Sequence, residues 1–251
     1  MTRRQLLSNA MVPPLFSGAR SALAPTGRRR WPRPLLAAAV LSAACTPPAP
    51  VDRGNRIKLP EPRRRSDVSL EWCLEVRRSI RSYRDLPLDL AQVAQLLWAA
   101  QGMTAPGGLR TAPSAGALYP LETYLVAGRV DGIPAGVYRY VAASHELAPG
   151  ARGDPRRGLA RAALDQNAVT DAPASIVFSA VYRRTTKKYG QRGVRYVHME
   201  VGHAGENVCL QAAALGLGTV TIGAFHDGEV KRVLQLPGEE EPLYILPVGR
   251  K

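Results

Sequence analysis

The stretch 196–225, YVHMEVGHAGENVCLQAAALGLGTVTIGAF, decides the fold that this sequence predicts. Apolar and small residues recur at helical spacing over 201–215, which predicts a buried helix. Its glycines and alanines allow another backbone to approach closely. Gly216 and Gly218 then end the helix, and 219–222 reads as a strand. This arrangement places bare backbone N–H groups at one spot, where a planar cofactor can approach.

The stretch 69–83 opens the folded body, and residues at helical spacing over 70–77 predict that its start is helical. If the helix continues, Arg77 and Arg81 share one face, a repulsion of about 0.2–0.5 kcal/mol that a bound anion would reverse. The alternative is a solvated basic helix end, which also suits the helix dipole. Asp89 is suited to cap a second helix over 90–101.

A long loop over 104–120, TAPGGLRTAPSAGALYP, follows this second helix. Its content of Pro, Gly and Ser excludes a regular element at its start. A loop of this length in a compact domain is usually functional. Ser114, Ala115 and Gly116 are small enough for a ring system to approach, with backbone N–H and hydroxyl groups toward its polar edge.

The rest of the body mixes strands with helices. The continuous apolar run at 174–181 is typical of a central buried strand, and 183–195 is strongly basic. The other expected elements are strands at 121–127, 136–141 and 242–248, a turn at 142–146, and helices at 154–167 and 227–236. We therefore expect an α+β body with a largely antiparallel sheet over residues 66–251.

The net charge of +14 is concentrated in a leader, residues 1–65. The leader holds 13 Lys and Arg against 2 Asp and Glu, a net charge of +11, which leaves +3 for the body. This distribution argues against a nucleic-acid surface on the body. Three cysteines do not make a disulfide framework, and no apolar run is long enough to span a bilayer.

The leader contains two competing export signals. Basic residues at 28–33, an apolar run at 35–44 and then Cys45 resemble a bacterial lipoprotein signal, although Ser42 stands where leucine is usual. The start, TRRQLL at 2–7, resembles a twin-arginine motif. Either signal implies a cell-envelope location, with 47–65 as a flexible tether. A wrongly chosen start codon or a plain tail on a cytoplasmic protein is the alternative.

Five blocks of the body together resemble one family. In chain order they are RRSIRSY, TAPSAGALYPLE, KKYGQRGVRY, GHAGENVCLQAAALGLGTVTIGAF and PLYILPVGR. They resemble the nitroreductase-like flavoproteins, and most closely the SagB-type (azoline oxidase-like) dehydrogenase branch, over about residues 66–251. The resemblance implies an intertwined homodimer of an α+β fold, with FMN bound at the dimer interface.

The resemblance also implies the FMN-binding residues. The ribityl phosphate would be held from the start and the end of the body, by Arg77, Ser79, Arg81 and Arg250. The loop would line the flavin through Pro113, Ser114, Ala115, Gly116 and Leu118. Backbone N–H groups near the flavin N5 and O4 would come from Gly218, Thr219 and Val220. The small-residue helix would then be the dimer core.

Lys188 and Tyr189 occupy the place of a Lys-Tyr pair that is proposed, in azoline-oxidising members, to take the substrate proton as hydride leaves. A base of this kind needs a lysine pKa that is lowered by burial or by nearby cations, and the surrounding basic residues can supply them. The alternative is that Lys188 is only one residue of a basic surface loop and has no catalytic role.

The sequence departs from the branch at Glu206, where glutamine is expected. A carboxylate in a packed helix near a reduced, anionic flavin is unfavourable unless it is paired.

His198 and His203 are five residues apart, which turns their rings about 140° from each other around a helix. We therefore expect structural histidines and no metal site.

We expect an FMN-dependent oxidoreductase that acts on a small-molecule or peptide-derived substrate. A NAD(P)H-dependent nitro or quinone reductase is one alternative, although an envelope location disfavours a cytoplasmic electron donor. A flavin-binding protein without turnover, a sensor or a scaffold, is another. A nucleic-acid binder would require DNA retention by the body alone.

Overall fold

The computed structural model describes residues 56–251. A seven-stranded sheet in the order β1-β4-β3-β2-β5-β7-β6 forms the centre, and neighbouring strands pair antiparallel. The strands are β1 (Ile57–Lys58), β2 (Leu121–Ala127), β3 (Gly136–Val141), β4 (Glu146–Arg152), β5 (Ala174–Ala180), β6 (Leu217–Thr219) and β7 (Glu241–Arg250). Every residue of β5 is buried, as the continuous apolar run predicts for a central strand.

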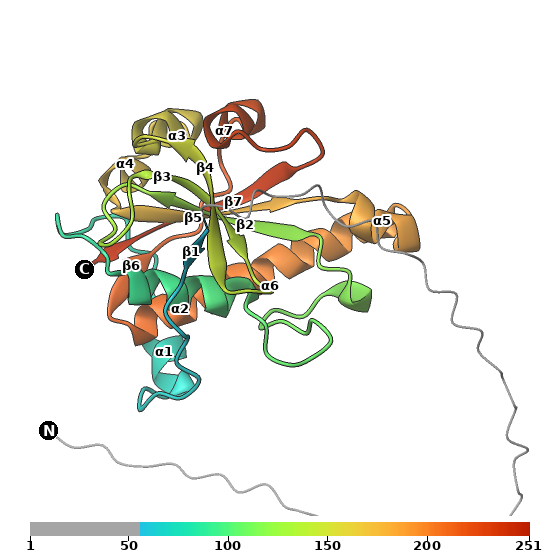
Figure 1. Cartoon of the computed structure of the whole chain (residues 1–251), viewed down its shortest axis with the longest axis horizontal. Helices are drawn as coiled ribbons and strands as arrows, with labels where there is room; N and C mark the ends of the chain where they lie inside the picture. The colour runs from blue at the N-terminus through green and yellow to red at the C-terminus, as the bar shows by residue number, and fades with distance from the viewer. Residues whose placement is uncertain (1–55) are drawn as a thin grey trace, which may run out of the picture. The chain divides into compact units, whose positions relative to one another are not determined.

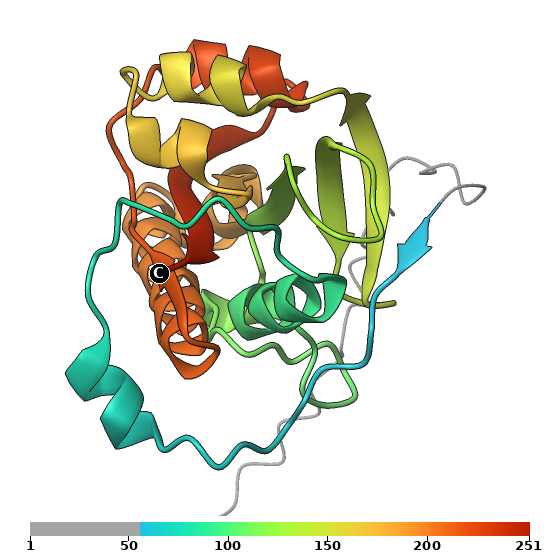
Figure 2. The same ribbon diagram turned by 90° about the vertical axis from the view of Figure 1, so that its left-hand side faces the viewer.

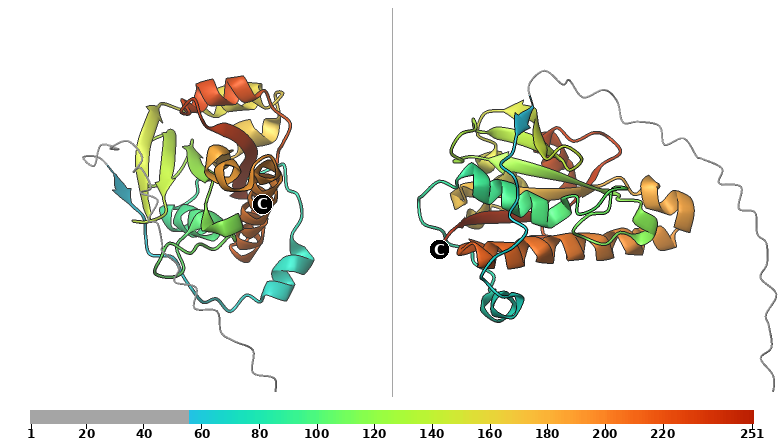
Figure 3. Two further views of the ribbon diagram at one scale, coloured as in Figure 1. Left: turned by 90° about the vertical axis from the view of Figure 1, so that its right-hand side faces the viewer. Right: turned by 60° about the horizontal axis from the view of Figure 1, so that its bottom comes forward.

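Helices cover both faces of the sheet (Figure 1). One face packs on α2 (Leu90–Gln101) and α6 (Arg192–Ala214). The other face packs on α3 (Arg156–Ala162), α4 (Asn167–Asp171) and α7 (Asp227–Leu234). The helix α1 (Leu70–Val76) lies outside these layers in Figure 2, and α5 (Arg183–Tyr189) projects beyond the sheet in Figures 1 and 3. The expected α+β architecture is thus confirmed.

Both helices that border the predicted site have the expected ends. Asp89 caps α2 through a reciprocal capping box with Gln92, whose backbone N–H donates to the carboxylate at 2.7 Å. The long helix α6 ends at Ala214, and Gly216 follows in the left-handed region with φ 70°. A glycine adopts this conformation without the Cβ clash that other residues would meet.

The predicted helical start is confirmed as α1, but this helix ends at Val76 and does not continue to Arg81. After that residue the backbone is extended, and the Ile80 N–H donates to the Thr219 carbonyl at 2.9 Å. Arg77 and Arg81 therefore do not share a helical face. Pairing with β6, 140 residues away in the chain, replaces the helical hydrogen bonds.

Two other stretches differ from the sequence expectation. The helix expected over 154–167 is divided into α3 and α4 by Leu164 and Asp165, which have φ of 58° and 55°. The basic stretch 183–195 is not a loop but forms α5 and the start of α6. Arg and Lys are good helix formers, which accounts for these turns of helix.

Residues 56–65 are part of the body rather than a flexible tether. The strand β1 pairs with β4, and Leu59 is buried. Farther along, the Gln95 side chain accepts from the Arg63 N–H at 2.8 Å and donates to its carbonyl at 3.0 Å. The predicted boundary at residue 65 is therefore too late, because residues 57–63 already contact the body. The export signals and Cys45 lie outside the described residues.

Candidate functional site

The loop before β2 is fixed in a strained conformation. Gly116, Ala117 and Tyr119 have positive φ of 64°, 53° and 45°, which is unfavourable for the two that are not glycine. Tyr119 is held at three points: its N–H donates to the Ser114 hydroxyl at 2.9 Å, its carbonyl accepts from Arg184 at 3.1 Å, and its ring lies 4.5 Å from the Arg110 guanidinium. Pro113 and Gly116, both predicted to line the flavin, are exposed.

The predicted catalytic pair lies directly over this loop. A Cβ atom added to Gly116 would stand 2.7 Å from the Tyr189 hydroxyl oxygen and 3.0 Å from the Lys188 Nζ. The Lys188 ammonium also lies 5.4 Å from the centre of the Tyr189 ring. Two blocks that are 70 residues apart in the chain, which the resemblance assigns to catalysis and to flavin contact, are therefore neighbours in the fold.

Glu200 is a buried carboxyl group that the sequence analysis did not single out for this site. It lies on α6, its side chain is 2% exposed, and its Oε1 has no hydrogen-bond partner within the described residues. Burial raises its pKa to about 7, against a hydrogen bond from Ser114 and the charge of Arg110, which both lower it. The sequence held one sign of this burial, because Glu200 is one helical turn before Ala204, which lies on the side of the helix predicted to be buried.

The raised pKa predicts a pH-dependent stability that Glu200→Gln should remove. Because the folded protein holds this proton up to about pH 7 and the unfolded chain releases it near 4.5, stability contributed by Glu200 is full below pH 4.5 and is lost as pH rises through 7. Glutamine mimics the neutral carboxyl group. We expect the variant to match the wild type at pH 5 and to melt at a higher temperature at pH 8, measured by thermal unfolding. Parallel melting curves across this range would contradict the assignment.

The second part of the candidate site forms where residues 79–84, near the start of the body, contact β6 and β7 near its end. The Arg84 N–H donates to the Arg250 carbonyl at 2.8 Å, and the Tyr83 hydroxyl donates to the Pro247 carbonyl at 3.1 Å. A Cβ atom on Gly218 would stand 2.7 Å from Ile80 Cγ2. The segment 79–84 is therefore pressed against β6 and β7, which carry the residues predicted to face the flavin.

The three arginines predicted to hold the phosphate share this backbone neighbourhood, but their side chains do not share a partner. Arg77 pairs with Glu206, with 3.6 Å between Nε and Oε1. Arg250 donates to the Pro87 carbonyl at 3.2 Å and lies 3.9 Å from the Asp89 carboxylate. Arg81 makes no ion pair among residues 56–251. Their convergence on one phosphate stays a prediction.

Glu206 is not the buried charge that the sequence suggested. Its side chain is 49% exposed and is paired with Arg77 at the C-terminal end of α1. The unusual carboxylate at this position is therefore solvated and partly neutralised. It also occupies a guanidinium that the resemblance assigns to the phosphate.

We expect Glu206→Gln to tighten FMN binding about two- to fivefold. The substitution removes a negative charge near the predicted phosphate position and frees Arg77, and exposed pairs of this kind contribute about 0–1 kcal/mol. Titration of the apoprotein with FMN, followed by flavin fluorescence, measures the effect. Glu241→Gln, which breaks the exposed pair with Lys231 on the other face of the sheet, is the matched control and should leave the affinity unchanged.

The region predicted to face the flavin contains a polar atom without a partner. Thr219 is 4% exposed, and its hydroxyl makes no hydrogen bond to any described residue. A buried hydroxyl of this kind is usually satisfied, and an unsatisfied one costs about 1–3 kcal/mol. This hydroxyl is closed off from solvent in the chain alone, so a flat ring would meet the loop instead. The exposed Pro113 and Gly116 there leave the surface open to a flavin.

The histidines and cysteines have structural surroundings. The His198 Nε2 lies 2.7 Å from the Tyr182 hydroxyl, and Cys73 and Cys209 are buried free thiols. Within residues 56–251, no three His, Cys, Asp or Glu side chains are placed to hold a metal ion.

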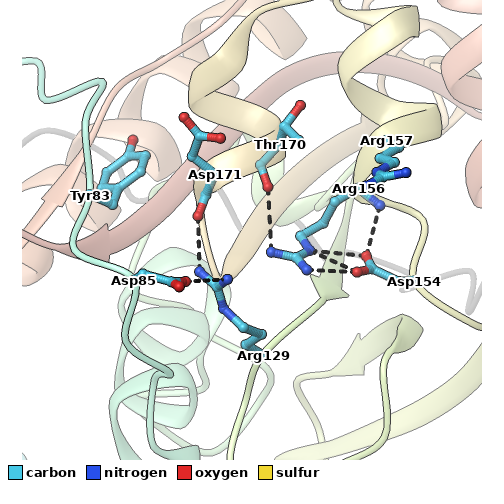
Figure 4. Close-up of a pocket in the computed structure, with 8 residues that line it drawn as sticks. All are labelled: Tyr83, Asp85, Arg129, Asp154, Arg156, Arg157, Thr170 and Asp171. Carbon is cyan, nitrogen blue, oxygen red and sulfur yellow. Dashed lines mark hydrogen bonds and ion pairs between the residues drawn. The ribbon is translucent and has the colours of Figure 1, made fainter.

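A separate cavity of about 580 Å³ lies elsewhere in the molecule (Figure 4). Two of its guanidinium groups are already bound: Arg129 pairs with Asp85, and Arg156 pairs with Asp154 at 2.6 Å. None of the predicted flavin or catalytic residues lines it; the lining is Tyr83, Asp85, Arg129, Asp154, Arg156, Arg157, Thr170 and Asp171. The cavity is therefore distinct from the flavin site proposed below.

Comparison with known proteins points to one family. The model of the nitroreductase family matches residues 74–250. A protein of Methanocaldococcus jannaschii described as a nitroreductase is 46% identical over 185 residues, which cover 74% of this chain and 92% of the relative. The microcin B17-processing protein McbC of Escherichia coli is 29% identical over 59% of this chain and 57% of its own length.

Solved structures agree with these sequence relatives. A nitroreductase structure from Ralstonia eutropha superposes with a TM-score of 0.69 at 32% identity, covering 78% of this chain and 89% of that one. A chain of the E. coli microcin synthetase McbBCD complex superposes with a TM-score of 0.60 at 25% identity, covering 74% of each chain. The expected nitroreductase-like fold is confirmed.

Proposed function

Because the chain belongs to the nitroreductase family, we propose that it is an FMN-dependent oxidoreductase that transfers hydride through the flavin N5 atom. The observation that carries the proposal is the placement of Lys188 and Tyr189 over Gly116, beside the loop assigned to the flavin.

Separate groups of residues would bind the cofactor and transfer the proton. When bound, FMN supplies hydride transfer at N5. Gly218, Thr219 and Val220 orient the pyrimidine edge, while Arg77, Ser79, Arg81 and Arg250 hold the phosphate. Oxidation of a substrate releases one hydride, which FMN would take, and one proton, which the neutral amine of Lys188 would accept beside the Tyr189 hydroxyl. Ser114 positions the loop, because its hydroxyl accepts from Tyr119 and donates to Glu200.

The test is the spectrum of the purified full-length protein. We expect a yellow protein that releases FMN on denaturation, is bleached by dithionite and is reoxidised by quinones or nitroaromatic compounds. Bleaching without reoxidation by any such acceptor would favour the alternative, a flavin-binding protein without turnover. A colourless protein that does not take up added FMN would overturn the proposal.

We also propose that the functional unit is a homodimer. The helix α1 exposes Leu70 at 59% and Leu74 at 55%, four residues apart on one helical face. It lies outside the main layers, as Figure 2 shows, and has only α6 beside it over much of its length. A second copy of the chain would bury this face, and size-exclusion chromatography with light scattering tests this.

The location and the substrate of this protein stay predictions. No helix within the described residues is long and apolar enough to cross a membrane. Export of the folded protein to the cell envelope, with a lipid on Cys45, stays a prediction, and the mass of the mature N-terminus tests it. A peptide-derived substrate is favoured by the similarity to McbC, and a NAD(P)H-dependent nitro or quinone reduction by the similarity to the nitroreductases.

A further inference from the structure

The excess positive charge of the folded body lies in one segment of thirteen residues, 183–195. Residues 66–251 carry 21 Lys and Arg against 18 Asp and Glu. Six of these cations and none of the acids fall within 183–195. The remaining body therefore has 15 basic and 18 acidic residues, a net charge of −3, against +6 for this short segment.

Five of the six cations are free and exposed. Arg184 pairs with Glu122 at 2.6 Å. The other five make no ion pair with any residue from 56 to 251, and all are exposed: Arg183, Lys187, Lys188, Arg192 and Arg195. We call these five residues the basic face. Without counter-ions of their own, they leave a positive potential on α5 and the first turn of α6.

The basic face adjoins the candidate site through a continuous set of contacts. The Arg192 guanidinium lies 5.8 Å from the centre of the Tyr196 ring. That ring packs edge-on against Tyr189, with 5.1 Å between the ring centres. The Tyr189 hydroxyl in turn stands over Gly116. The basic face therefore lies next to the predicted catalytic pair, of which Lys188 is itself a member.

From this placement we propose that the substrate of the candidate site is a small anion, a molecule with a carboxylate, sulfonate or phosphate group next to its reacting part, and that the basic face attracts it. The proposal rests on the proposed function. A polyanion such as nucleic acid would extend over the rest of the body, whose net charge of −3 repels it. A small anion meets only the local charge, and the basic face raises its association rate.

The experiment compares two quinones that differ in charge. The FMN-loaded full-length protein is reduced with dithionite, and its reoxidation by 1,4-naphthoquinone-2-sulfonate or by neutral 2-methyl-1,4-naphthoquinone is followed by stopped flow. Each quinone takes two electrons and two protons to become the hydroquinone. Isothermal titration of both quinones into the oxidised protein measures binding separately from turnover.

We expect the anionic quinone to lose its rate advantage as ionic strength rises from about 20 mM to about 1 M, because the screening length falls to about 3 Å. Arg192→Glu should lower its rate constant and affinity at low salt about three- to fivefold more than those of the neutral quinone. Lys187→Glu provides the same test on α5. Arg157→Glu is the control, since it makes the same charge change at an exposed arginine of α3, at the opposite end of the view in Figure 1.

Equal effects of Arg192→Glu and Lys187→Glu on both quinones, or equal effects of Arg157→Glu on the anionic one, would overturn the proposal while leaving the flavoenzyme assignment intact. A protein that binds no FMN would overturn both.

Discussion

Replacing Gly116 by alanine is expected to lower the turnover of the FMN-loaded protein about 100-fold. The added Cβ would stand 2.7 Å from the Tyr189 hydroxyl and 3.0 Å from the Lys188 ammonium. Either the loop or the pair must move by a distance of the order of 1 Å, and such a displacement at a reacting centre can cost about two orders of magnitude in rate. The rate of reoxidation by a quinone after dithionite reduction measures the effect.

Gly108→Ala is the matched control for this substitution. Gly108 lies in the same loop and has φ of 87°, so alanine there also pays the cost of a left-handed conformation, about 1–2 kcal/mol. No heavy atom lies within 4 Å of its added Cβ. We expect Gly108→Ala to lose some stability and to keep its turnover. If the two variants lost activity equally, the clash with Lys188 and Tyr189 would not be the cause.

The second large effect is expected for Gly218→Ala, which should lose FMN. Its Cβ would stand 2.7 Å from Ile80 Cγ2 and 2.8 Å from Ile80 Cβ, and neither strand can move freely because the Ile80 N–H is bonded to the Thr219 carbonyl. Overpacking of this kind costs about 1–3 kcal/mol. It also separates the segment that carries Ser79 from the strand that carries Thr219, the two sides assigned to the cofactor.

We expect the melting temperature of Gly218→Ala to fall by about 3–10 °C and its dissociation constant for FMN to rise at least about tenfold. Gly228→Ala is the control, because its added Cβ meets no atom within 4 Å and alanine favours the interior of α7. It should be at least as stable as the wild type. A Gly218→Ala protein that melts lower yet binds FMN normally would show that β6 does not contact the cofactor.

Local sequence signals were sufficient where an element depends on its own residues. The capping box at Asp89, the left-handed Gly216 and the apolar run of β5 lie within a few residues of the hydrogen bonds or packing they produce. The same signals failed beyond Arg77 and at Leu164. Beyond Arg77, a distant strand supplies the partner of the Ile80 N–H, and at Leu164 and Asp165 two residues that are not glycine adopt positive φ.

The candidate site also has features that the sequence predicts and features that only the tertiary structure shows. Its residue types and chain order were enough to indicate the family and to name the glycine-rich and basic blocks that would surround a flavin. Which groups meet was decided only by the tertiary structure. It placed Lys188 and Tyr189 over Gly116, turned the Ser114 hydroxyl toward Tyr119 and Glu200, and left Glu206 in solvent beside Arg77.

By itself, then, the sequence determined the α+β class, the nitroreductase family, the start of α2 and the end of α6, because periodicity, caps and motif order are local properties of the chain. Only the tertiary structure decided the burial of Glu200 and the neighbours of the predicted catalytic pair. Burial and contact depend on residues that are distant in sequence, and the pKa of a carboxyl group responds to that surrounding rather than to its own neighbours in the chain.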